Sequence, residues 1–514
     1  MKATALRASL LPLLTFGYVS LAGAATFTVD DPGDPVGVST TLRTAITQAN
    51  ASADPLDIIV FNLPTNSVIT LASELPVISD DVIIDGANVP GLAINGAGQF
   101  RIFNIDTAAD EVVMINDLQL TAGGTSGSAG DNGGAILIAD SEQVTLTNVS
   151  IDASTADASG GGIYVGAAEL TISGGVFSNN VAGGVSASEG GGAIYGLGGT
   201  IMIADGASFS DNRASGAAGS GGAIHLSGGS AEVTGGDFTR NLSNRAGGAL
   251  EISAAAAQMT VTIDGVSFVE NDAGLSPGNG GAIHVTAPSS NAIVSVDVSG
   301  GAFTGNLAGA EGGGLWNDVQ GVMSVTGATI SGNSASGAAA DQGGGGLFNN
   351  GGNLSIATTT VDGNTADGAA GSGGGILNDG GMLMVSGGVI SANSASRAGG
   401  GLEVTTVNGR DSDTTLQGVT FSTNRTGPAP GNGGGVHVTD PSGDANASDM
   451  TVTGGAFTGN IASEEGGGLW NDAGGTLTID GSAITGNTAS GPGADQGGGG
   501  VFNNGGTVTL TSAT

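Results

Sequence analysis

Along most of this chain, short alternations of apolar and polar residues are separated by glycine-rich turns. Leu170–Ile172, Val261–Ile263 and Leu477–Ile479 each carry an apolar side chain at every second position. A two-residue period is typical of short β-strands, whose side chains point alternately to opposite faces of a sheet. After residue 133 no stretch of helix length has a helical period. The pattern therefore predicts an all-β protein.

The alternations belong to a repeat of about thirty residues. Each repeat has two glycines, a small residue and an aliphatic residue, and later an aromatic or aliphatic residue followed three positions on by Asn. The stretch Glu311–Gly352 contains a long version of this repeat, and the same pattern recurs at Glu465–Gly506. The aliphatic residues are Ile136, Ile163, Ile194, Ile224, Leu250, Ile283, Leu315, Leu347, Ile376, Leu402, Val436, Leu469 and Val501. The Asn residues are Asn180, Asn212, Asn241, Asn271, Asn306, Asn333, Asn364, Asn393, Asn424, Asn460 and Asn487.

Three short strands in each repeat cannot bury their own apolar residues, but they can close one turn of a coil. The strands of such a coil pair in parallel with those of the coils above and below. We therefore expect residues 133–514 to form a right-handed parallel β-helix whose coils rise by about 4.8 Å each. The recurring Asn is expected to form hydrogen bonds along the stack, because a catalytic residue would not recur in coil after coil.

The segment 25–132 departs from the repeat, and we expect it to form an N-terminal cap and the first irregular coils. Thr41–Asn50 has apolar residues at helical spacing, which predicts a short amphipathic helix with Ser39 or Thr40 as its N-cap. Strands are expected at Thr26–Asp30, Asp57–Phe61, Ser67–Leu71, Val82–Asp85, Arg101–Ile105 and Val112–Ile115. An open stack of coils needs such a cap over its terminal apolar section.

Residues 1–24 have the pattern of a cleavable signal peptide. Lys2 and Arg7 precede an apolar segment, Leu10–Leu21, and Ala22–Ala24 provides a small-residue cleavage site. We expect the mature chain to have no transmembrane segment and to be secreted or displayed at the cell surface. At the other end, Thr514 aligns with the middle of a coil, so we expect the repeat domain to be truncated at its C-terminus.

The formal net charge is −36, and 46 Asp and Glu residues face only 10 Lys and Arg residues. Nucleic acids and anionic lipids are therefore poor partners. The chain has no Cys, so neither disulfides nor thiolate-bound metals stabilise it. No cofactor or metal ligand is assigned, although this acidity leaves loose binding of divalent cations open.

The alternating motifs resemble the repeats of polymorphic outer-membrane proteins. Gly191–Ile194 with Phe209–Asn212, and Gly280–Ile283 with Phe303–Asn306, are two examples. In that family the repeats form the passenger of a surface-displayed adhesin, which implies an adhesin-like protein at the outer membrane of a bacterium. This chain departs from the family, because no outer-membrane barrel is recognised within these 514 residues and Phe is replaced at Ile330, Val361, Ile390 and Ile484.

The N-terminal segment is similar to the cap of large exported bacterial repeat proteins. Those proteins begin with a strand, an S-L-R-E-A-I-x-x-A-N helix and a D-x-I-x-F strand. The corresponding segments here are Thr41–Asn50 and Asp57–Phe61. Thr44 replaces the usual Glu, and the usual Cys before the helix is absent.

The residue after each repeat aliphatic should point outward if the aliphatic points inward. Both Trp residues and all three His residues of the protein occupy this column. The column is either an exposed stripe that stacks on sugars or binds a protein, or a self-stabilising ladder partly covered by loops. The candidate stripe consists of Tyr164, Tyr195, His284, Trp316, Phe348, His437, Trp470 and Phe502, and the same column holds Leu137, His225, Glu251, Leu377 and Glu403.

Two pairs of opposite charge, Arg245 with Glu251 and Arg397 with Glu403, recur with their coils. We expect them to be surface ion pairs, since an active site is normally single. No catalytic residue is assigned. The sequence favours a monomeric, non-enzymatic exported scaffold or adhesin that binds an extracellular glycan or protein. The alternative is a polysaccharide lyase or glycoside hydrolase, because pectin-degrading enzymes share the pectin-lyase-like β-helix fold.

Overall fold

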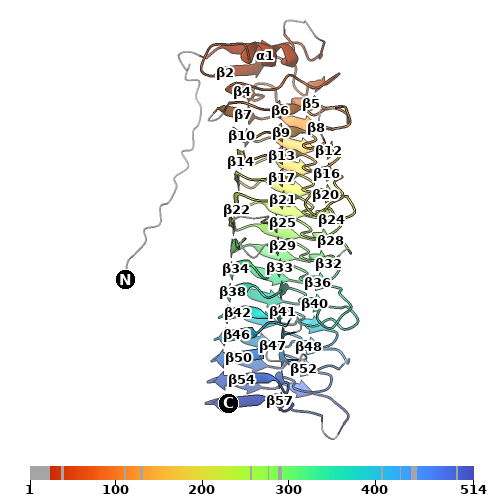
Figure 1. The fold of residues 1–514 in the computed structure, drawn as a ribbon, viewed down its shortest axis with the longest axis vertical. Helices are drawn as coiled ribbons and strands as arrows, with labels where there is room; N and C mark the ends of the chain where they lie inside the picture. Colours follow the sequence, from red (N-terminus) through yellow and green to blue (C-terminus); the bar gives the residue numbers. More distant parts are fainter. Residues whose placement is uncertain are drawn as a thin grey trace, which may run out of the picture.

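The computed structural model describes residues 24–35, 40–108, 111–127, 131–254, 258–275, 277–287, 292–406, 409–428, 430–440, 448–493 and 496–514. Apart from Ala24, the expected signal peptide lies outside these residues, and so does Ser39. The chain forms a long stack of coils with the helix α1 (Leu42–Ala49) at its N-terminal end (Figure 1). The strands of successive coils pair in parallel, for example β13 with β17 and β17 with β21. The protein is therefore an all-β parallel β-solenoid.

In the described residues, four sheets, which we call A, B, C and D, run along the stack with 17, 15, 14 and 12 strands. Sheet C consists of β6 (Phe103–Ile105), β9 (Ile136–Ile138), β13 (Ile163–Val165), β17 (Ile194–Gly196), β21 (Ile224–Leu226), β25 (Leu250–Ser253), β29 (Ile283–Thr286), β33 (Leu315–Asn317), β37 (Leu347–Asn349), β41 (Ile376–Asp379), β45 (Leu402–Thr405), β49 (Val436–Val438), β53 (Leu469–Asn471) and β57 (Val501–Asn503).

Sheet A follows sheet C in each coil. It consists of β1 (Thr26–Val29), β2 (Asp57–Phe61), β4 (Val82–Asp85), β7 (Val112–Asn116), β10 (Gln143–Thr147), β14 (Glu169–Ser173), β18 (Thr200–Ala204), β22 (Ser230–Thr234), β26 (Met259–Asp264), β30 (Val294–Ser299), β34 (Gly321–Thr326), β38 (Asn353–Ala357), β42 (Gly381–Ser386), β46 (Ser412–Gln417), β50 (Ser448–Thr453), β54 (Gly475–Asp480) and β58 (Thr507–Thr511).

Sheet B comes next. It consists of β3 (Val68–Thr70), β5 (Ala93–Asn95), β8 (Gln119–Thr121), β11 (Ser150–Asp152), β15 (Val176–Ser178), β19 (Ser208–Ser210), β23 (Asp237–Thr239), β27 (Ser267–Val269), β31 (Ala302–Thr304), β35 (Thr329–Ser331), β39 (Thr360–Asp362), β43 (Val389–Ser391), β47 (Thr420–Ser422), β51 (Ala456–Thr458) and β55 (Ala483–Thr485).

Sheet D closes the coil with strands of two residues each, so a typical coil has four strands where the sequence predicts three. Its strands are β12 (Thr155–Ala156), β16 (Val181–Ala182), β20 (Arg213–Ala214), β24 (Leu242–Ser243), β28 (Asp272–Ala273), β32 (Leu307–Ala308), β36 (Ser334–Ala335), β40 (Thr365–Ala366), β44 (Ser394–Ala395), β48 (Arg425–Thr426), β52 (Ile461–Ala462) and β56 (Thr488–Ala489). Two residues are too few to produce a visible alternation in the sequence.

In the N-terminal segment, β1, β2, β3, β4, β6 and β7 lie at the six expected strands. The three-residue strands β5 and β8 were not predicted. Helix α1 is confirmed, and its apolar face packs into the core. Its N-cap is Thr41 rather than Thr40, because the Thr41 hydroxyl accepts the hydrogen bond from the Thr44 backbone N–H.

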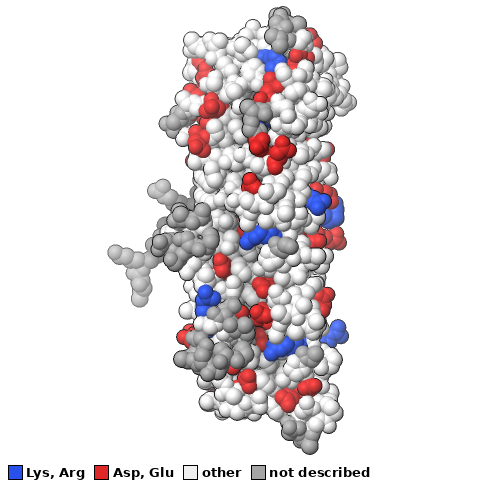
Figure 2. Space-filling view, turned by 45° about the vertical axis from the view of Figure 1, so that its right-hand side comes forward, with Lys and Arg blue, Asp and Glu red and all other residues white. Residues whose placement is uncertain are grey.

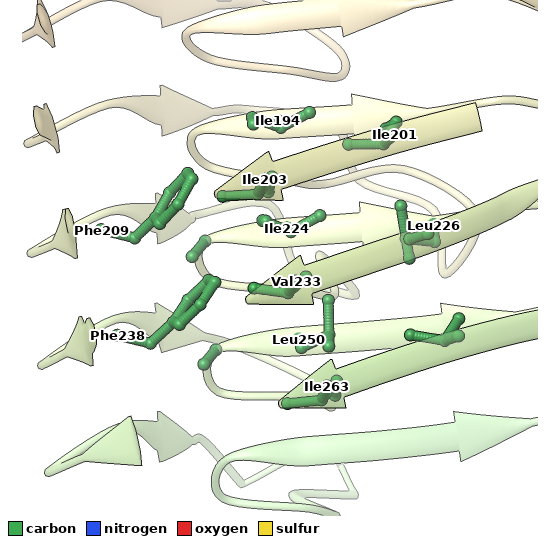
Figure 3. Close-up of a cluster of buried hydrophobic side chains, with 14 of the residues drawn as sticks. Ile194, Ile201, Ile203, Phe209, Ile224, Leu226, Val233, Phe238, Leu250 and Ile263 are labelled. Carbon is green, nitrogen blue, oxygen red and sulfur yellow. The ribbon is translucent and has the colours of Figure 1, made fainter. Parts of the chain in front are cut away.

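The apolar core runs inside the coils from the N-terminal segment to the last coils. Ile224 of sheet C and Val233 of sheet A face each other across it, and Phe209 and Phe238 stack beside them (Figure 3). The Phe column continues through Phe268 and Phe303, with ring centroids 4.7–5.0 Å apart between successive coils. The rings are nearly parallel at these distances, the geometry of offset stacking, so the spacing of the coils suits a continuous column of Phe side chains.

The recurring Asn residues form a continuous buried ladder, as the sequence predicts. Asn241 Nδ2 donates to Asn271 Oδ1, and the same bond joins each neighbouring pair from Asn180 to Asn487 at 2.8–3.0 Å. Each Asn also donates to a backbone carbonyl, as Asn271 does to Phe238. The ladder thus satisfies the backbone groups of the turn between sheets B and D.

Candidate functional site

The outer column of sheet C points away from the apolar core, as strand alternation predicts, but most of it is not open to solvent. Trp316 is 6 % exposed, Trp470 5 % and His284 3 %. The expectation of an exposed aromatic stripe is therefore wrong for these residues, and also for Tyr195, Phe348 and His437. Only Tyr164 and Phe502 of the candidate stripe are partly exposed.

The segments that connect sheet D to sheet C cover this column. The Tyr195 hydroxyl donates to the backbone carbonyl of Ser188 at 3.0 Å, and Trp316 Nε1 donates to Glu311 Oε2 at 3.0 Å. These contacts join the column to the covering segment of the same coil. Sequence periodicity gives the direction of a side chain but does not say whether a loop folds over it, which is why the burial was missed.

Within the covered column, aromatic and imidazole rings stack from coil to coil. The His284 and Trp316 rings are 4.4 Å apart, and Trp316 and Phe348 are 6.2 Å apart. Tyr164 and Tyr195 also stack, with centroids 5.4 Å apart. This arrangement agrees with the second alternative from the sequence, a self-stabilising ladder of side chains partly covered by loops.

The first polar cluster lies at β25 and β29. His284 Nδ1 is 2.9 Å from Glu251 Oε2, and Arg245 Nη1 is 3.7 Å from Glu251 Oε1. Arg245 also donates to Ser220 Oγ at 3.1 Å. The Glu251 side chain is 1 % exposed, so the expectation of a surface ion pair is wrong. This carboxylate is buried with two cationic or titratable partners.

Electrostatics within this cluster favour an ionised Glu251. Burial alone would raise the pKa of its carboxyl, but the charge and hydrogen bond of His284, with smaller effects of His225 and Arg245, together hold the pKa below its usual range. His225, one coil away in register, is fully buried, and among the described residues its ring nitrogens form no hydrogen bond with a side chain. Burial lowers the pKa of His225, which keeps its imidazole neutral.

A second copy of the cluster lies at β45 and β49. His437 Nδ1 is 2.9 Å from the Glu403 carboxylate, and Arg397 Nη1 is 3.4 Å from Glu403 and donates to Ser372 Oγ at 2.9 Å. The His437 ring stacks on Trp470 at 4.3 Å. The copies differ at one position, because Leu377 takes the place of His225.

At the edge of the first cluster, three oxygen-bearing side chains lie on successive coils. Asn279 pairs with Glu311 in a parallel bridge, and Asp341 belongs to the loop before β37. Burial raises the pKa of Glu311, the hydrogen bond from Trp316 lowers it, and the charge of Asp341 raises it again. Sequence reasoning missed these residues, although Asn279 and Glu311 recur as Asn432 and Glu465.

The outer face of sheet A is a long open surface of regularly spaced side chains. Its strands from β10 to β58 contain no Lys or Arg. The central outward column, with one residue per coil in register, is Thr145, Thr171, Met202, Glu232, Thr262, Asp297, Ser324, Ser355, Met384, Thr415, Thr451, Thr478 and Thr509. These side chains are exposed or partly exposed. Another face, drawn in Figure 2, shows charged groups scattered over a largely uncharged surface.

A shallow hollow of about 350 Å³ lies near β4 and β8. Asp117 is the one charged residue that lines it. Within the part of the chain that the structure describes, no three His, Cys, Asp or Glu side chains form a metal-binding group. In that same part, no helix has the length and apolar character needed to cross a membrane.

Comparisons with known proteins leave the family open. No family model and no curated protein matches the chain, so the resemblance to polymorphic outer-membrane protein repeats stays a hypothesis. The crystal structure of a mutant of the periplasmic alginate epimerase AlgG matches with a TM-score of 0.31 and 10 % identity, covering 96 % of this chain and 84 % of that one. At that TM-score the likeness carries no argument about function.

Proposed function

We propose that this chain is a non-enzymatic exported scaffold, adhesin-like in character, that binds an extracellular glycan along the outer face of sheet A. The observation that carries the proposal is the long register of hydroxyl groups on that face, typified by Thr262 and Thr451. Hydroxyl groups at regular spacing can exchange hydrogen bonds with a polymer that is itself rich in hydroxyl groups. The leader-like residues 1–24 support export to the cell surface or the medium.

The charge of the chain narrows the ligand class. A net charge of −36 opposes binding of polyanions such as polyuronates. A neutral or amino-bearing glycan is therefore the better partner. Of the aromatic column, Tyr164 and Phe502 are the members that solvent reaches, and we include them as secondary contacts.

Binding to insoluble and arrayed neutral polysaccharides tests the proposal. The double variant Thr262→Lys, Thr451→Lys places long cationic side chains on the face of sheet A and should weaken binding at least tenfold. The matched control is Ala187→Lys, an exposed position in a loop over sheet C. Equal binding by the double variant and the wild type would remove the face of sheet A from the proposal, and no binding to any glycan would remove the adhesin function.

A second candidate, a glycoside hydrolase or polysaccharide lyase, rests on the carboxyl groups of Glu311 and Asp341. A carboxyl group with a raised pKa near a second carboxylate can serve as a general acid. Release of reducing ends or of unsaturated products from a glycan, lost on Glu311→Gln, would favour this candidate over the scaffold. No turnover of any glycan that the chain binds would favour the scaffold.

A further inference from the structure

The edge of the first polar cluster has the composition of a cation site, and the inference drawn from it does not depend on the proposed function. Asn279 and Glu311 are paired in register, and the Gly280 backbone N–H donates to the Glu311 carbonyl at 2.9 Å. Side chains at paired positions of parallel strands leave the backbone on the same side, about 4.8 Å apart. The Asn279 and Glu311 side chains thus leave adjacent coils on the same side.

The Trp316 side chain fixes the position of the Glu311 carboxylate. Trp316 Nε1 donates to Glu311 Oε2 at 3.0 Å, and the Trp316 ring lies on the His284 ring. The second carboxylate oxygen is left without a bond from the indole. The Trp316 side chain therefore orients Glu311, and the Gln342 side chain also forms a hydrogen bond with this carboxylate. A carboxylate has about four lone-pair sites, so two such bonds leave acceptor capacity for a cation.

Asn279 provides an independent sign of a missing ligand. Its side chain is 8 % exposed, and its Oδ1 atom is buried without a hydrogen-bond partner among the described residues. A buried amide oxygen without a partner costs free energy, and such groups in proteins are normally paired. The same is true of Asn432, which is also 8 % exposed and has an unpartnered Oδ1.

The third oxygen group comes from the next coil. The Gly312 backbone N–H donates to the Gly343 carbonyl at 2.9 Å, which places the loop containing Asp341 over Glu311. Gln342 closes this loop, because its Oε1 atom accepts from the Ala339 backbone N–H at 3.1 Å. The Glu311 and Asp341 carboxylates are therefore held on adjacent coils, and their mutual repulsion favours a bound cation.

We propose that Asn279 Oδ1 and the carboxylates of Glu311 and Asp341 form a calcium site. All three groups offer oxygen, which hard cations prefer, and the irregular set of a strand edge and a loop suits Ca²⁺ better than the strict octahedron of Mg²⁺. Waters and loop carbonyls complete the coordination. The cation bridges three successive coils and fixes the loop over the Trp316 column.

The hydrogen bond between a Glu and the Trp five residues later recurs in the second copy of the cluster. Glu465 Oε2 accepts from Trp470 Nε1 at 2.9 Å, and Asn432 stands one coil away. Asp495, which would be the third group there, lies outside the described residues. The repeated Asn and Glu argue that the pair has a common role in both copies of the cluster.

Terbium luminescence tests the calcium site directly, because Tb³⁺ replaces Ca²⁺ and emits when a nearby indole is excited. The full chain is used with Trp470→Phe, so that Trp316 is the one remaining indole. We expect sensitised Tb³⁺ emission that Ca²⁺ displaces and Mg²⁺ displaces at least tenfold less well. Glu311→Gln, Asp341→Asn and Asn279→Ala should each weaken Tb³⁺ binding at least tenfold.

Asp297→Asn on the outer face of sheet A is the control, since it removes an acidic group that is remote from Trp316 along the coil. Circular dichroism identifies any variant that fails to fold, and Asp341→Asn in its partly exposed loop keeps the test available if Glu311→Gln unfolds. Emission that responds equally to Asp297→Asn and Asp341→Asn, or no sensitised emission at all, would overturn the site and leave only diffuse binding to an acidic surface.

Discussion

Glu251 and His284 occupy register positions in adjacent coils, and their side chains lie 2.9 Å apart beneath the loops that cover sheet C. The residues are far apart in the chain but neighbours in the stack. Glu403 and His437 repeat the same contact in the second copy of the cluster. A buried carboxylate needs a partner of this kind, because an isolated buried charge is strongly unfavourable.

Removing the imidazole should therefore be costly. His284→Leu removes the hydrogen-bond partner of the buried Glu251 carboxylate, leaving Arg245 and the neutral His225 beside it, and is expected to lower the free energy of unfolding by about 3–5 kcal/mol. The double variant Glu251→Leu, His284→Leu should recover most of that loss. Urea unfolding measures both effects, and a double variant as unstable as His284→Leu would show that packing, not charge, dominates.

Acid should destabilise the coils around the first polar cluster, because His225 takes up a proton when they unfold. Its folded-state pKa is lowered from the ordinary 6.5, so the unfolded chain takes up the proton more readily below about pH 6.5 and folding stability falls as the pH falls. The loss is at most about 1.4 kcal/mol per pH unit for one group. His225→Leu introduces the residue that Leu377 provides in the second copy of the cluster. This variant should show a smaller fall in melting temperature between pH 7 and pH 5 than the wild type, measured by thermal unfolding.

The Glu251 carboxyl adds to acid sensitivity only at lower pH. Its folded-state pKa lies below the ordinary 4.5, so its contribution to stability is present above that value and is lost as the pH falls through the folded pKa. The loss of stability through His225 therefore occurs at a higher pH than the loss through Glu251, so the two effects can be measured separately. If the melting temperature of His225→Leu falls between pH 7 and pH 5 by as much as that of the wild type, the assignment to His225 is wrong.

Both indoles should be shielded in the folded protein. Trp316 and Trp470 are the only Trp residues and are 6 % and 5 % exposed. Acrylamide quenching of their emission should be weak in buffer and should rise severalfold in denaturant. Strong quenching in the native state would restore the open binding stripe that the sequence suggested.

The Asn ladder should be a major source of stability. Asn271→Ala removes the acceptor of Asn241 and the donors to Asn306 and Phe238. We expect a loss of roughly 3 kcal/mol, because several buried groups lose partners at once. Asn353→Ala, on the exposed face of sheet A, should change stability by less than about 0.5 kcal/mol. Chemical denaturation compares the two variants, and similar losses would argue against the ladder.

The Phe column should tolerate a change of shape better than a loss of volume. Phe268→Ala leaves a cavity between Phe238 and Phe303 and should cost about 3–5 kcal/mol. Phe268→Ile should cost less than half as much, since Ile330 and Ile390 fill the same column in other coils. The unfolding free energies of the two variants decide this, and equal costs would mean that ring stacking itself matters most.

The sequence alone determined the solenoid, because each strand pairs with a near-copy of itself one coil away. The alternation of residues such as Leu170 and Ile172 sets which side chains face inward, and the repeat of Asn180 sets the turn. Helix α1 was also predictable, since four apolar residues at helical spacing suffice to define a buried face.

Only the tertiary structure decided what covers the outer column. Whether Trp316 is open or shielded depends on how the loops between sheets D and C fold, and no two-residue or 3.6-residue period describes a loop. The same holds for the partner of Glu251, which the sequence placed with Arg245 at the surface and the structure places with His284 in the interior. The Asn279–Glu311–Asp341 edge was likewise invisible, because its members lie on three coils and meet only when those coils stack in register.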